Sequence, residues 1–92
     1  MASSFDWTGF EKSEITGLAR PLLVAKGSKG YAACAYVDTA AAEKFNEACV
    51  IFTGVANHDA FLDAEVKKAS QKALLLGIRI GMKGRAALNL LR

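Results

Sequence analysis

The sequence has few of the residues that build metal sites, disulfide frameworks or membrane spans. It contains two cysteines, Cys34 and Cys49, and one histidine, His58. Two separated cysteines and one histidine lack the spacing of zinc ligands and are too few for a disulfide framework. The longest uninterrupted apolar run, Tyr31–Val37, is far shorter than the roughly 20 residues that span a membrane. We therefore expect no metal, no membrane partner and two buried thiols in a reducing cytoplasm.

Acidic residues are missing from the last third of the chain. The 92 residues are 52% apolar and 23% charged, with a net charge of +3, which fits one small globular domain. Residues 1–65 hold five basic and nine acidic side chains, whereas residues 66–92 hold seven basic ones and no acidic one. A basic segment of this kind indicates nucleic-acid contact or a solvated helix face. The small overall charge does not favour nucleic acid, and nucleic-acid binding through residues 66–92 is kept as an alternative.

The hydrophobic pattern predicts an α+β fold in a single domain, 1–92. Short apolar runs predict strands over 22–25, 31–37 and 49–53, and the glycine-containing turn 26–30 makes the first two a hairpin. Segment 1–19 is predicted to be extended and to add further strand pairing, while 20–92 forms the core. The sheet is expected to be mixed or antiparallel, with helices on one face.

Helical spacing predicts three helices, over 39–48, 64–76 and 84–91. The second has the clearest pattern, because apolar residues recur at intervals of four and three from Leu62 to Leu76. Gly77 then stands where a helix commonly ends. Ile78–Ile80 is a further short strand candidate.

The loop before the last predicted helix is a candidate ligand site. It contains Gly81, Lys83, Gly84 and Arg85. Two glycines allow backbone N–H groups to approach an anion, and two basic side chains add positive charge. The alternative is a tight structural turn, in which Gly81 supplies an unusual backbone conformation and Gly84 allows close packing.

Cys34 and His58 are a candidate catalytic pair. A thiol near neutral pH becomes a nucleophile when a base or a positive field stabilises its thiolate. His58 is the one histidine that could act as this base, through a tertiary contact. The alternative is a buried core thiol and a histidine at a helix start. No nucleophile elbow, P-loop or dinucleotide fingerprint is present, and we expect no cofactor.

Three stretches carry a resemblance to a known family. They are Gly30-Tyr-Ala-Ala-Cys-Ala-Tyr-Val-Asp38, Phe52-Thr-Gly-Val-Ala-Asn-His-Asp-Ala-Phe-Leu-Asp-Ala64 and Gly77-Ile-Arg-Ile-Gly-Met-Lys-Gly-Arg-Ala-Ala-Leu88. Over residues 20–91 the chain resembles the YunC-like family of small uncharacterised bacterial and archaeal proteins. The resemblance implies an α+β domain whose N-terminal β-region drives tetramer formation, and it implies no established activity.

Apolar side chains without an evident place in the core favour self-association. Phe5, Trp7 and Phe10 lie in a segment too short to bury them alone, and Leu75 falls outside the apolar stripe of the predicted helix 64–76. The alternative is that the aromatic residues fold back on their own sheet. We predict a small, non-catalytic, cytoplasmic homo-oligomer, a tetramer by the resemblance, that binds a partner or an anionic small ligand. An enzyme using Cys34 and His58 is an alternative.

Overall fold

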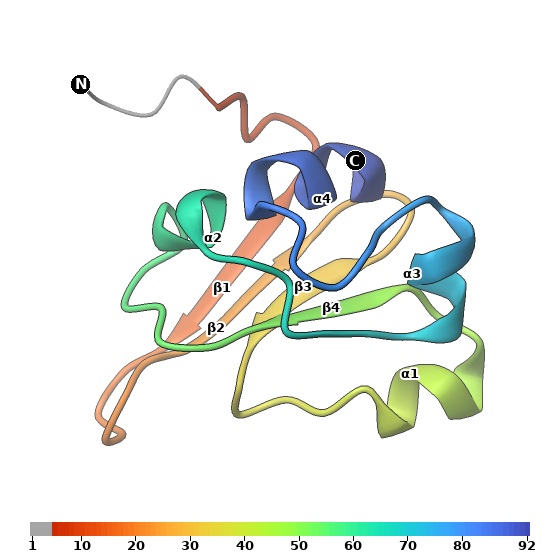
Figure 1. Cartoon of the computed structure of the whole chain (residues 1–92). Coiled ribbons are helices and arrows are strands. Elements are labelled where there is room, and N and C mark those ends of the chain that lie inside the picture. The colour runs from red at the N-terminus through yellow and green to blue at the C-terminus, as the bar shows by residue number, and fades with distance from the viewer. Residues whose placement is uncertain (1–4) are drawn as a thin grey trace.

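The computed structural model describes residues 5–92, which form a mixed five-stranded sheet with helices on both sides (Figure 1). The strands lie side by side in sequence order: β1 (Glu11–Ile15), β2 (Leu22–Lys26), β3 (Tyr31–Cys34), β4 (Cys49–Phe52) and β5 (Lys68–Ala69). The helices are α1 (Ala40–Phe45), α2 (Ala60–Asp63), α3 (Gln71–Leu75) and α4 (Gly84–Leu91). This arrangement confirms the α+β prediction. None of these helices is long and apolar enough to cross a membrane.

The first three strands are antiparallel, as the predicted hairpin requires. In the register of β2 and β3, Lys26 pairs with Tyr31, and the Gly27 N–H donates to the Gly30 carbonyl at 2.7 Å to close the turn. β1 adds the predicted N-terminal pairing and forms one edge of the sheet. The predicted strand 31–37 is shorter in the structure, because the chain turns after Cys34 and the Val37 N–H donates to its carbonyl at 3.0 Å.

α1 connects β3 to the parallel strand β4 and corrects one prediction. The expected helix 39–48 ends early, where Asn46 takes a φ of 57°. Ala42 of α1 packs with Ala33 and Ile51 on the face of the sheet opposite α4. The expectation that all helices cover one face is therefore wrong. All four residues of β4 are buried, and a strand that is apolar on both faces requires cover on both.

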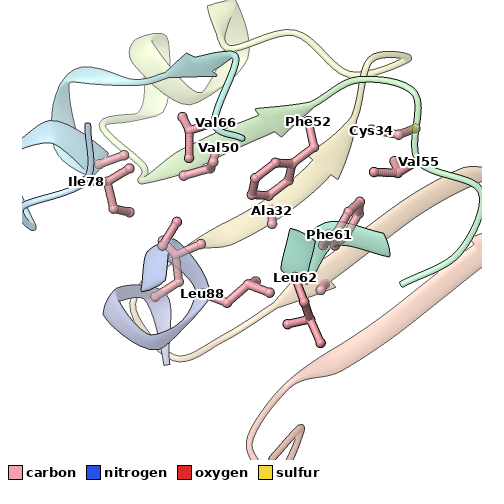
Figure 2. Close-up of a cluster of buried hydrophobic side chains, with 14 of the residues drawn as sticks. Ala32, Cys34, Val50, Phe52, Val55, Phe61, Leu62, Val66, Ile78 and Leu88 are labelled. Atoms are coloured by element: carbon pink, nitrogen blue, oxygen red, sulfur yellow. The ribbon is translucent and has the colours of Figure 1, made fainter. Parts of the chain in front are cut away.

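The larger core lies between the sheet and helices α2 and α4. Phe52 of β4 stacks on Phe61 of α2 with ring centroids 5.2 Å apart, and Leu88 of α4 is fully buried in the same cluster (Figure 2). The closing helix matches its predicted range, 84–91. Its apolar residues at a spacing of three and four face this core, as the pattern indicates.

The prediction of a helix over 64–76 is wrong in its first half. Residues 68–69 form β5 beside β4, and α3 begins only after Ser70. The backbone N–H groups of Lys67 and Ser70 donate to β4 carbonyls at 2.9 Å. These bonds give hydrogen-bond partners to the side of β4 that would otherwise be an open sheet edge. Val66 and Ala73 both reach the core, Val66 from the irregular stretch before β5 and Ala73 from α3. The predicted strand at Ile78–Ile80 is irregular in the structure.

Candidate functional site

The glycines of the predicted ligand loop support the fold. Gly81 has a φ of 87°, and its N–H donates to the Val66 carbonyl at 2.9 Å. The Gly84 N–H donates to the Ala64 carbonyl at 2.7 Å, and a Cβ at Gly84 would overlap the carbonyl of Phe61. Because these donors are already used, the loop resembles the tight structural turn of the alternative interpretation more than an open anion cradle.

The side chains of this loop stand among charges of both signs. The Lys83 Nζ lies 3.9 Å from a Glu65 carboxylate oxygen and 3.4 Å from the Asp63 carbonyl oxygen. A hollow of about 430 Å³ beside the loop is lined by Asp63, Glu65 and Lys67 as well as Lys83. An anion in this hollow would rely on Lys67 and Lys83 against the two carboxylates, and Arg85 is not among the lining residues, so the site stays a prediction.

Cys34 and His58 hydrogen-bond to different parts of the backbone. The Cys34 Sγ accepts the Leu23 N–H at 3.3 Å and donates to the Pro21 carbonyl at 3.7 Å. The Nε2 of His58 lies 3.0 Å from the Ser13 carbonyl and 3.1 Å from the Val24 carbonyl. Since carbonyl oxygens only accept, Nε2 must carry the proton.

Among residues 5–92, no hydrogen bond or ring contact joins the Cys34 thiol to the His58 ring. Cys34 is buried at the end of β3, close to Val55 (Figure 2), where it lines a hollow of about 260 Å³ with Arg20 and Tyr36. Within the described part of the chain, the hydrogen-bond partners of the thiol are backbone groups and not a base, so the catalytic pair stays a prediction without support from these contacts.

The N-terminal aromatic residues pack on the chain's own core. The rings of Phe5 and Trp7 meet edge to face at 4.8 Å, and both rest with Phe10 against the larger core. The Trp7 Nε1–H also donates to an Asp59 carboxylate oxygen at 3.2 Å. This is the folded-back alternative. Leu75, the fourth predicted interface residue, is 75% exposed on α3.

Sequence reasoning missed a second group of charged residues. A hollow of about 250 Å³ is lined by Lys26, Lys29 and Lys72, together with Ser28 and Glu47. The hollow lies beside Tyr31, whose phenol pKa is raised by burial and by its contact with the Cys49 thiol. Burial likewise raises the pKa of Cys49. The two lysines in and beside the turn 26–30 are visible in the sequence, but tertiary structure alone brings them to the same hollow as Lys72.

Comparison with known proteins identifies the family. Residues 33–91 match a family described as a domain of unknown function, DUF1805. The chain belongs to this family. The DUF1805 chain is also similar to a solved protein of unknown function, TA1206 from Thermoplasma acidophilum, at 34% identity and a TM-score of 0.78. That match covers 90% of this chain and 91% of the other. No curated protein matches.

These findings confirm the resemblance to a small uncharacterised family, and they assign no activity. The DUF1805 match begins at residue 33 and includes Cys34, His58 and the loop 81–85, whereas strands β1 and β2 precede it. Among the described residues of this DUF1805 chain, no group of three or more His, Cys, Asp and Glu side chains is placed to hold a metal ion.

Proposed function

We propose that this protein is a non-catalytic homo-oligomer whose copies meet through the β1–β2 hairpin, residues 11–26. One observation carries the proposal: the tip of this hairpin extends beyond the helices, on the side away from α3 (Figure 1). Every residue of β1 is exposed, including Ile15 at 55%, and Leu18 in the connecting turn is 49% exposed. Exposed apolar side chains on a projecting element favour contact with another molecule.

The position of β1 in the sheet supports a second copy of this chain as the partner. Strand order makes β1 an edge, so one side of its backbone faces no other strand within the described sheet. Such an edge pairs readily with another strand. On the adjoining face, α1 covers β3 and β4 through Ala42, while Val24 of β2 is only partly buried. The β1–β2 hairpin of a second copy would cover both the open edge of β1 and the partly buried Val24.

The proposal extends to assembly size and compartment. The family resemblance implies a tetramer formed by the N-terminal β-region, which coincides with this hairpin. Both cysteines are buried and free, which is consistent with a reducing cytoplasm. The aromatic residues Phe5, Trp7 and Phe10 would then stabilise the hairpin by packing on the core. Leu75 is a second candidate for contact between copies.

Light scattering on a size-exclusion peak tests the proposal. The parent chain is expected to have the mass of several copies, and the double variant Ile15→Asp with Leu18→Asp is expected to be a monomer with an unchanged circular dichroism spectrum. Ile80→Asp is the matched control, because Ile80 is 60% exposed outside the hairpin. A monomeric parent chain, or a double variant that assembles like the parent, would overturn the proposal.

A further inference from the structure

The hollow lined by Lys26, Lys29 and Lys72 lies at the end of the sheet opposite the projecting hairpin tip. Its volume is about 250 Å³, and its walls come from the β2–β3 turn, the α1–β4 connection and α3. Figure 1 shows these three segments gathered toward one end of the molecule. A hollow of this size is below the roughly 300–1,000 Å³ of pockets that enclose a whole drug-sized ligand, and it suits a single charged group of a ligand.

One wall is the turn from Gly27 to Gly30, which is anchored in a single position. The Gly27 N–H binds the Gly30 carbonyl, and the Lys29 N–H donates to the Leu91 carbonyl of α4 at 2.9 Å. A Cβ at Gly27 would overlap the Leu91 carbonyl, and one at Gly30 would crowd Ala48. The backbone bearing Lys26 and Lys29 is therefore fixed against the core.

The opposite wall is fixed by Ser70. Its Oγ donates to the Glu47 carbonyl at 2.7 Å and accepts the Ala73 N–H at 3.3 Å. These bonds tie the α1–β4 connection to the start of α3, which carries the partly buried Lys72. Lys29 and Lys72 consequently border one hollow from two supported walls.

The charges around this hollow are unbalanced. Among the described residues, the ion pairs involve Lys68 and Lys83, and neither of these lines the hollow. Its lining includes three lysines and one carboxylate, that of Glu47, with the Ser28 hydroxyl nearby. Ammonium groups bind phosphate and carboxylate oxygens as point charges, and a hydroxyl adds a hydrogen-bond donor.

We propose that this hollow binds a small molecule through a dianionic group, a phosphate monoester or a dicarboxylate, held between Lys29 and Lys72 with Lys26 at the rim. Glu47 repels the same ligand and limits its affinity. It is distinct from the loop 81–85, where the sequence predicted an anion.

Amide chemical shifts of the full chain test the site, with inorganic phosphate and malonate as probes at an ionic strength held constant with sodium chloride. Saturable shifts are expected in residues 26–31, 46–48 and 72. The probe that binds more tightly identifies the group. Shifts no larger than those from chloride, or shifts centred on residues 81–85, would overturn the proposal.

Charge variants separate this site from general attraction to a basic protein. Lys29→Gln and Lys72→Gln should each weaken binding about tenfold, the effect of losing one charged hydrogen bond. Lys44→Gln removes the same charge from α1, outside the hollow, and should leave binding unchanged. Glu47→Gln should tighten it. Equal weakening by all three lysine variants, or no tightening by Glu47→Gln, would contradict a built site.

Discussion

The Ser70 hydroxyl joins three segments at one buried point. It accepts the Cys49 N–H at 2.9 Å and the Ala73 N–H at 3.3 Å, and it donates to the Glu47 carbonyl at 2.7 Å. The side chain is fully buried, so water has no access to replace these partners. One hydroxyl thereby caps α3 and fixes the start of β4.

Replacing this hydroxyl should be costly. Ser70→Ala is expected to lower the free energy of unfolding by about 2–3 kcal/mol, because it leaves buried backbone groups unpaired and removes a helix cap. Urea denaturation followed by circular dichroism measures the loss. Ser28→Ala, at an exposed serine, should change stability by less than about 0.5 kcal/mol. Similar values for the two variants would show that the Ser70 contacts contribute little.

Single residues of the candidate sites could be predicted where their role depends on their neighbours in the sequence. The turn chemistry at Gly81 and the burial of Cys34 follow from neighbouring residues, and both occur in the structure. The group Lys26, Lys29 and Lys72 depends on a turn and a helix more than 40 positions apart. Nothing in the local pattern indicates that these lysines share a hollow, which is why sequence reasoning missed them.

At the scale of elements, the start of α4 lies in close contact with α2. Gly84 is the first residue of α4, and its backbone lies directly against the Phe61 carbonyl of α2. The Gly84 N–H also donates to Ala64 just after α2. A larger residue at this contact would push the two helices apart and disturb the stacked Phe52 and Phe61 rings.

Gly84→Ala should therefore destabilise the protein by about 3 kcal/mol, a cost typical of overpacking in a tight core. Gly81→Ala is the informative comparison, because its added Cβ meets no atom within 4 Å and only the φ of 87° is unfavourable. That variant should cost about 1 kcal/mol. Thermal and urea unfolding give the ranking, and an equal or reversed order would contradict packing as the role of Gly84.

The elements themselves were predictable where the local pattern and the tertiary contacts agree. Strands β2 and β4 and helix α4 match their predicted ranges closely, because apolar runs and helical spacing coincide with the buried faces. Segment 64–76 has the strongest helical spacing, yet the edge of β4 recruits residues 68–69 as a strand. Hydrogen bonding to a sheet edge is a tertiary effect that periodicity does not contain.

At the scale of the whole molecule, the two described chain ends meet beside α4. The Arg92 guanidinium lies 5.0 Å from the Phe5 ring centroid and 5.2 Å from that of Phe10, and its Nη1 donates to the Thr8 carbonyl at 2.9 Å. This contact joins the segment leading into β1 to the end of the last helix (Figure 1). It holds the base of the projecting hairpin to the core.

Arg92→Ala should lower the free energy of unfolding by about 1–2 kcal/mol, the combined effect of two exposed hydrogen bonds, to Thr8 and Asn89, and the cation–π contacts. Part of this loss should vanish when Phe10 is already Leu, since that change keeps an apolar side chain but removes one of the two rings that Arg92 faces. Urea titration at one fixed protein concentration measures the four variants of the cycle.

The matched control for this cycle is Arg85→Ala, at the partly buried arginine near the start of α4. It removes the same charge and should change stability by less than about 0.5 kcal/mol when no anion is added. If Arg92→Ala has the same small effect, or if its cost is unchanged in the Phe10→Leu background, then the chain ends touch without stabilising each other. The hairpin would in that case be held without Arg92, by the β1–β2 ladder and by the bonds of His58 to Ser13 and of Trp7 to Asp59. Oligomerisation would then not depend on Arg92.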